Sequence, residues 1–292
     1  MTSARIELVN LNGRAQLVVD GTLIDVERRS ARRFSYKPMD VIELWEPFCE
    51  WAREQRPDED ASRLVPARLS APVPAPSQLF AIGLNYRAHA QETSANLPKE
   101  PMVFTKFQSC LCGPYAEIPI VSDSVDWEVE LCVVIGRGGR RIKAERALEH
   151  VAGYCVGQDI SDRKRQRADV PPQFSLAKSA ACFGPLGPAL VAAVSLPDPS
   201  ALRLTCDVDG ERMQDARTAD MIFSVPELVA YLSRYCELRP GDLIFSGTPS
   251  GVGVARNPPR FLQPGQRIES AIEGIGKLDN RCVPGVASAG SD

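Results

Sequence analysis

Residues 125–135 read VDWEVELCVVI, and this stretch constrains the fold more than any other in the chain. Acidic and apolar residues alternate in its first half, whereas its second half is apolar at every position. Alternation with a period of two is typical of a strand with one polar face, and a continuous apolar run is typical of a strand covered on both faces. The stretch therefore predicts a strand that enters a core, with Asp126, Glu128 and Glu130 on one face where the cover begins.

These three acids have two interpretations. An ordinary half-exposed strand would leave them in water. However, like charges on neighbouring positions of one face repel, and carboxylates at the border of a covered region need a compensating cation. Neighbours on one face lie about 6.6 Å apart, so the side chains of Glu128 and Glu130 can converge on one divalent ion. Asp126 lies about 13 Å from Glu130, which predicts a surface acid or one that supports the site indirectly.

A two-carboxylate site needs a further ligand. The stretch VAGYCVGQDISDRKRQ, residues 151–166, ends an apolar run at Asp159, a carboxylate at a strand end. The cluster Arg163–Gln166 behind it could hold an anionic substrate or form a charged surface loop. The chain has only two histidines, so a multi-histidine zinc site is nearly excluded and any metal is expected to have mostly oxygen ligands.

Composition narrows the classes of partner. With 34 basic and 37 acidic residues the net charge is −3, which argues against a nucleic-acid or anionic-membrane surface. No apolar run approaches the ~18 residues of a membrane span, and no apolar signal core follows the N-terminus, so a cytoplasmic location is expected. Nine cysteines without a C-x-x-C pair are expected to be small buried residues.

The order of predicted elements favours a mixed α+β fold that is mainly β. Turn signals at Asn12-Gly13 and Asp20-Gly21 predict short antiparallel strands, followed by an amphipathic helix over 41–55 that Pro47 can interrupt. The proline-rich residues 66–78 predict a linker. We therefore expect a small N-terminal α/β domain over residues 1–70 and a main domain over 71–292. Within the main domain, strands are predicted at 79–84, 102–106, 127–135, 151–158, 202–208 and 242–246, and a capped helix from Ser224.

Eight motifs in order resemble the fumarylacetoacetate hydrolase superfamily over about residues 79–283. They are AIGLNYRAHAQE (81–92), PMVFTKFQSCLCGP (101–114), VDWEVELCVVIGR (125–137), VAGYCVGQDISDRKRQ (151–166), AKSAACFGPLGP (177–188), TADMIFSVPELVAYLS (218–233), PGDLIFSGTPSGVG (240–253) and EGIGKLDN (273–280). The resemblance implies a β-roll catalytic domain, usually as a homodimer. It also implies a Mg²⁺, Mn²⁺ or Ca²⁺ ion held by Glu128, Glu130 and Asp159.

The same resemblance implies roles for further residues. His89 and Glu92 correspond to a dyad that activates water, and Lys178 to a lysine that supports negative charge. The positions expected to contact the substrate are Arg163, Gln166, Thr248 and Tyr86. One departure is Ala181, where many relatives have aspartate after KSF, which is expected to alter the pocket floor or the support of Lys178. The segment 167–176 also departs from the pattern and is expected to be a lid with its own specificity.

The expected function is metal-dependent hydrolysis of a C–C bond in a 2,4-dioxo acid such as an acylpyruvate, a small-molecule substrate. A metal-dependent decarboxylase of the oxaloacetate type, or an isomerase or tautomerase of oxo acids, would use the same site. A binding protein that is stabilised by metal but has no turnover is a third interpretation, which the intact set of site residues makes less favourable.

Overall fold

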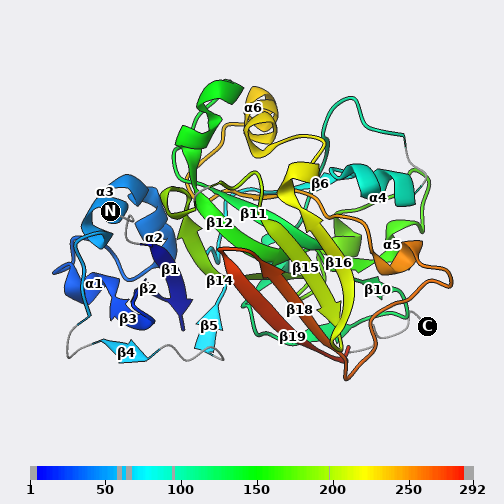
Figure 1. Cartoon of the computed structure of the whole chain (residues 1–292), viewed down its shortest axis with the longest axis horizontal. Helices are drawn as coiled ribbons and strands as arrows, with labels where there is room; N and C mark the ends of the chain where they lie inside the picture. Colours follow the sequence, from blue (N-terminus) through cyan, green and yellow to red (C-terminus); the bar gives the residue numbers. More distant parts are fainter. Residues whose placement is uncertain (1–4, 58–60, 64–67, 94–95, 197, 286–292) are drawn as a thin grey trace, which may run out of the picture.

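The computed structural model describes residues 5–57, 61–63, 68–93, 96–196 and 198–285, and the described chain is mainly β with a few short helices (Figure 1). The helices are α1 (Val26–Arg29), α2 (Pro38–Glu43), α3 (Trp45–Ala52), α4 (Arg87–Glu92), α5 (Arg163–Gln166) and α6 (Val225–Tyr235). The strands of the largest sheet are β1 (Glu7–Leu11), β2 (Arg14–Val19), β3 (Thr22–Asp25), β4 (Ser62–Arg63), β5 (Leu69–Ser70), β6 (Leu79–Gly83), β7 (Met102–Thr105), β8 (Leu111–Cys112), β11 (Val129–Ile135), β12 (Val151–Gln158), β14 (Gly184–Ala192) and β17 (Leu243–Phe245).

Two smaller sheets complete the fold. One has the strand order β16-β15-β18-β19-β9 and consists of β9 (Ile118–Ile120), β15 (Arg203–Val208), β16 (Glu211–Arg217), β18 (Arg267–Ile272) and β19 (Gly276–Pro284). The other is the pair β10 (Val125–Asp126) and β13 (Ser161–Asp162). In Figure 1 the β15, β16, β18 and β19 ribbons run in front of β11, β12 and β14. The fold class predicted from the sequence is confirmed.

Strand β11 lies at the centre of the largest sheet, between β12 and β17, and every one of its residues is buried. Its alternate side chains enter two different cores. Val129, Leu131 and Val133 pack in a cluster with residues of β15 and β18, whereas Cys132 and Val134 pack with the N-terminal strands and helices. The sequence prediction of a strand covered on both faces is therefore confirmed, except that the strand begins at Val129 and not at Trp127.

The N-terminal segment continues the same sheet, because β1 pairs with β14 in antiparallel register. Both predicted hairpin turns are present, joining β1 to β2 and β2 to β3, with positive φ at Asn12, Gly13, Asp20 and Gly21. The predicted single helix over 41–55 is wrong in one respect: it is two helices, α2 and α3, separated at Leu44 and not at Pro47, which lies in the first turn of α3.

The division into domains at residue 70 stays a proposal, and the first residues of the predicted linker lie outside the described ones. Helix α6 begins after Ser224, whose backbone N–H donates to the Glu227 side chain, as the predicted capping box requires, and whose hydroxyl donates to the same carboxylate. None of the described helices has the length and apolar character needed to cross a bilayer. All nine cysteines are free thiols, and six of them are buried.

Candidate active site

Three acids meet where β11 begins and β12 ends. Glu130 is on β11, Glu128 precedes it, and Asp159 follows the last residue of β12. The two strands are antiparallel with Val129 opposite Gln158, and the Asp159 N–H donates to the Glu128 carbonyl at 2.9 Å. One carboxylate oxygen from each acid lies within 4.8 Å of the others, and all three residues are buried. The pairing of the strands therefore assembles the triad that the sequence analysis names.

The triad fits a hard divalent cation. Its donors are all carboxylate oxygens, which Mg²⁺, Mn²⁺ and Ca²⁺ accept. Burial raises the pKa of Glu130 well above its ordinary value, and the charges of Asp159 and Glu128 raise it further. Crowding of like charges in a covered site is the situation that a bound cation relieves. Each carboxylate oxygen has two lone pairs, so the hydrogen bonds described below leave room for a metal–oxygen bond.

Two buried lysines contact the triad. The Lys178 ammonium donates to Glu128 and Asp159, both at 2.7 Å, and to the Ser161 hydroxyl at 2.8 Å. The Lys106 ammonium donates to Asp159 at 2.7 Å and to the main-chain carbonyl of Lys178. Lys106 therefore fixes both a triad acid and the backbone of the second lysine.

Arg163 links the triad to Asp126. Its guanidinium donates to Asp126 at 2.8 Å, to Glu128 at 2.6 Å and to the Gln166 side-chain oxygen at 3.0 Å. The single turn of α5 places Arg163 and Gln166 on one face. Burial alone would raise the pKa of Glu128, but the charges of Lys178 and Arg163 outweigh it and lower this pKa to about 2. Asp126 is fully buried, so the surface alternative for this acid is wrong; it reaches Glu128 only through Arg163.

His89 and Glu92 form a pair on the short helix α4. The His89 Nδ1 lies 3.2 Å from one Glu92 carboxylate oxygen, as their i, i+3 spacing predicts. The other Glu92 oxygen accepts the Gly251 N–H at 2.9 Å. Because a carboxylate only accepts, the Nδ1 of His89 carries the proton in this pair, and its Nε2 is left as the basic nitrogen.

The loop 246–254 binds three acids through its backbone. The Gly247 N–H donates to Glu130 at 2.8 Å, the Gly251 N–H to Glu92 at 2.9 Å, and the Gly253 N–H to Asp126 at 2.7 Å. The φ angles of Gly247 and Gly251 are 100° and 102°, which residues with a Cβ rarely adopt. The sequence alone left this segment as either an active-site loop or a plain connection, and the structure places it in the site.

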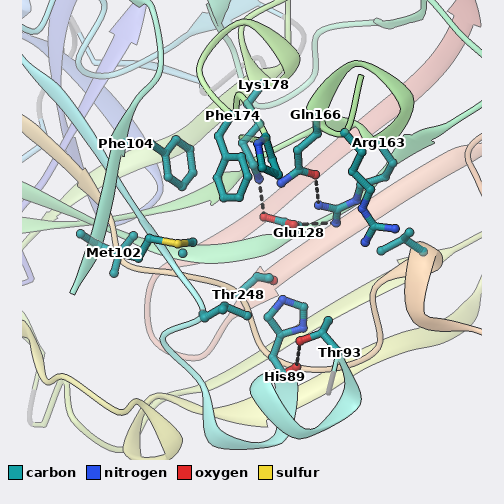
Figure 2. Close-up of a pocket in the computed structure, with 16 residues that line it drawn as sticks. His89, Thr93, Met102, Phe104, Glu128, Arg163, Gln166, Phe174, Lys178 and Thr248 are labelled. Atoms are coloured by element: carbon teal, nitrogen blue, oxygen red, sulfur yellow. Dashed lines mark hydrogen bonds and ion pairs between the residues drawn. The ribbon is translucent and has the colours of Figure 1, made fainter. Parts of the chain in front are cut away.

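Among these groups, His89, Glu128, Arg163 and Lys178 line a cavity of about 260 Å³. In Figure 2, Lys178, Gln166 and Arg163 lie along one side of it, and His89, Thr93 and Thr248 along the other. An apolar wall consists of Ile82, Met102, Phe104, Pro172 and Phe174. The Thr248 hydroxyl donates to the Val129 carbonyl at 2.9 Å, so toward a ligand it can act only as an acceptor.

Two residues lie elsewhere than the sequence analysis expects. Tyr86 is fully buried and is not among the residues that line the cavity, and its expected substrate contact stays a prediction. Ala181 is exposed and outside the cavity. Lys178 is held by two acids and Ser161, and the expected effect of Ala181 on the pocket floor or on this support stays a prediction.

The sequence analysis missed the structural roles of Lys106 and Asp126. Lys106 lies in one of the eight motifs, but nothing in its spacing indicates that it reaches Asp159, which is 53 positions further along the chain. Asp126 was excluded from the metal ligands because of its distance from Glu130 along an ideal strand. Its backbone partners, in loop 246–254, follow only from the tertiary fold.

Comparison with known proteins agrees with this geometry. Residues 78–283 match the family model described as fumarylacetoacetate (FAA) hydrolase C-terminal. The oxaloacetate tautomerase FAHD2B, mitochondrial, of Bos taurus is 46% identical over 215 residues, which are 73% of this chain and 68% of the relative. A proposed HpcE protein from Mycobacterium smegmatis is 48% identical with a TM-score of 0.91, covering 95% of this chain and 99% of that one.

A further solved structure holds ligands. Maleylpyruvate hydrolase from Sphingobium sp. SYK-6, in complex with manganese(II) ion and pyruvate, is 26% identical with a TM-score of 0.79, covering 97% of this chain and 100% of that one. The matched family region spans every residue of the candidate site, from His89 to Gly253. The chain belongs to the fumarylacetoacetate hydrolase family.

Proposed function

We propose that the protein is a divalent-metal-dependent tautomerase that interconverts the keto and enol forms of a small oxo acid of the oxaloacetate type. The observation that carries the proposal is that His89, the base of the His89–Glu92 pair, and Glu128 of the acidic triad line the same small cavity. The choice among reactions at this site is supported by the Bos taurus relative, which is named an oxaloacetate tautomerase.

The chain's own groups suffice for the proton transfers. An ion held by Glu128, Glu130 and Asp159 would polarise the oxo group and stabilise negative charge on its oxygen. His89 takes a proton from the carbon next to the oxo group through Nε2 and returns it to the enolate oxygen, which gives the enol. Glu92 holds the ring in the required tautomer and stabilises its charged form.

Hydrolysis of a C–C bond in a 2,4-dioxo acid is the second candidate. The same dyad could remove a proton from water, and the resulting hydroxide would attack the distal carbonyl and release a carboxylate and an enolate. The complex of maleylpyruvate hydrolase with manganese and pyruvate supports this alternative. Loss of CO₂ from an oxaloacetate-type acid would pass through the same kind of enolate, so decarboxylation is a variant of the same chemistry.

Product analysis in ¹⁸O-labelled water separates these reactions. The Mn²⁺-loaded protein is given oxaloacetate and, separately, an acylpyruvate. Faster interconversion of enol and keto forms, followed by ultraviolet absorbance and without CO₂ or a new carboxylate, is the expected result. Label in a new carboxylate would establish hydrolysis, and released CO₂ a decarboxylase. Absence of turnover with both substrates would refute the proposed function.

A matched pair of histidine variants tests the role of the dyad. His89→Ala is expected to abolish turnover while the rise in melting temperature with Mn²⁺ persists, because His89 is not part of the triad. His150→Ala is the control, since His150 lies outside the cavity and contacts the Arg137 carbonyl. Loss of the Mn²⁺ response in His89→Ala would count against its role as a base.

We further propose that the protein acts as a homodimer in the cytoplasm, as its resemblance to the family suggests. Light scattering on the purified chain checks the dimer: a mass near 64 kDa is expected from twice the chain mass of 31.9 kDa. A mass of a single chain would refute this assembly.

A further inference from the structure

Arg167 lines the cavity and is the first residue after α5. Its backbone N–H donates to the carbonyls of Arg163 and Lys164, which fixes the main chain at this point. Its side chain is exposed and, among the residues that the structure describes, has no hydrogen bond or ion pair. A guanidinium at a cavity wall without a carboxylate partner is available to an anionic ligand.

The other cations of the site are already paired. Lys106 and Lys178 contact Asp159, Lys178 also contacts Glu128, and Arg163 contacts Glu128 and Asp126. With Glu130 there are four buried carboxylates and three buried cations, which leaves one negative charge. A divalent ion converts this into one positive charge, which balances a single substrate carboxylate. A second carboxylate would have no buried cation left to pair with.

One wall of the cavity is apolar. Met102, Phe104 and Phe174 offer no hydrogen bond to a charged group, and a carboxylate placed against them unpaired would lose its hydration without compensation. Arg167 borders the same cavity, so its side chain can supply the missing partner with two parallel N–H donors.

We propose that Arg167 binds the distal carboxylate of a dianionic oxo acid and makes the site selective for dicarboxylates over monocarboxylates. This inference rests on the proposed function, because it takes the first carboxylate and the oxo group to lie at the acidic triad. It assigns to the segment 167–176 the specificity that its departure from the family pattern predicts. Pro172 and Phe174 of this segment line the same cavity, and the Gln173 N–H donates to the Gln166 carbonyl at 3.2 Å, which holds the segment over it.

Calorimetric titration of the Mn²⁺-loaded protein tests the proposal without turnover. The two probes are 2-oxoglutarate and 2-oxopentanoate, which differ by a carboxylate in place of a methyl group. The wild type is expected to bind 2-oxoglutarate more tightly. Arg167→Met is expected to weaken 2-oxoglutarate about tenfold and to leave 2-oxopentanoate within about twofold, whereas Arg167→Lys retains part of the preference.

Arg165→Met is the matched control. Arg165 is also exposed and changes the net charge equally, but it does not line the cavity, so it is expected to leave both affinities unchanged at physiological salt. Equal weakening of both probes by Arg167→Met, or an equal effect of Arg165→Met, would overturn the inference, as would a wild type without preference. A wild type that binds neither probe would overturn the proposed oxo-acid site itself, and the inference with it.

Discussion

Replacing Glu130 by glutamine is expected to stabilise the metal-free protein. Glu130 is 1% exposed, and burial and the charges of Asp159 and Glu128 hold its pKa well above the ordinary 4.5. Folding without metal therefore either crowds a third carboxylate into the triad or requires the side chain to take up a proton. Glutamine is neutral and nearly isosteric, and its side-chain oxygen can still accept the Gly247 N–H.

The size of the effect follows from the spacing of the triad. Oxygens of the three acids lie within 4.8 Å of one another, so each like-charged pair costs about 3.5 kcal/mol at an effective dielectric constant near 20. Glu130 takes part in two such pairs, and attraction to Lys178 offsets about one of them. Glu130→Gln should therefore raise the free energy of unfolding of the metal-free protein by roughly 3 kcal/mol at pH 7.

This gain depends on pH in a defined direction. Because the folded pKa of Glu130 is raised, the folded state holds a proton at pH values where the unfolded chain has released it, so the wild type loses stability as the pH rises above 4.5. Glutamine does not titrate. The difference between variant and wild type should vanish near pH 4, where both states of the wild type are protonated, and grow toward pH 7.

Thermal unfolding in EDTA and in Mn²⁺, followed by fluorescence of the buried tryptophans, measures both effects. Mn²⁺ at about 100 times its dissociation constant should stabilise the wild type by about 2.7 kcal/mol and should leave the variant nearly unchanged. Glu117→Gln, which removes an exposed carboxylate, is the control and should change stability by less than about 0.5 kcal/mol. A variant that is less stable than the wild type in EDTA, or that keeps the full Mn²⁺ response, would refute the reasoning.

Three further substitutions test the supporting groups. Asp126→Asn leaves the buried Arg163 guanidinium facing a neutral amide, so it should lower the free energy of unfolding in urea by about 3 kcal/mol. The variant should keep the stabilisation by Mn²⁺, and loss of that stabilisation would make Asp126 a metal ligand. Gly251→Ala should cost roughly 2 kcal/mol and lower kcat, because φ is 102° there and its N–H holds Glu92; unchanged kcat would remove this link. Lys178→Met should cost about 3 kcal/mol in EDTA, partly recovered by Mn²⁺, and no loss in EDTA would contradict its buried pairing.

Local patterns were sufficient to predict many of the elements, but they missed β14, β18 and β19 and some of the strand ends. The predicted strands 151–158 and 202–208 agree with β12 and β15 to within a residue, because the first is almost wholly apolar and the second alternates apolar and polar residues along its length. The predicted strand 127–135 begins two residues too early, because Val125 and Asp126 form the separate strand β10, which pairs with β13, and the chain enters β11 only at Val129. That choice depends on partners far along the chain.

The site shows the same boundary between local and long-range information. Spacing along one strand was enough to pair Glu128 with Glu130, and helical spacing to pair His89 with Glu92. Asp159 lies beside them because of the antiparallel register of β11 and β12, which the sequence pattern does not reveal. Its assignment as the third ligand came from the family resemblance. The distance argument for Asp126 assumed one straight strand, and the break at 127–128 removes that assumption.

The loop 246–254 makes the site sensitive to chain length in a way that its side chains do not suggest. The main-chain amides of Gly247, Gly251 and Gly253 hold Glu130 of the triad, Glu92 beside the base, and Asp126, which pairs with Arg163. Several side chains of the loop could be exchanged without touching these bonds. A single inserted or deleted residue, by contrast, would move these amides relative to one another and break several of their hydrogen bonds to the three acids. Apart from Gly247 and Gly251, the residue types of this loop should therefore vary among relatives more than its length does.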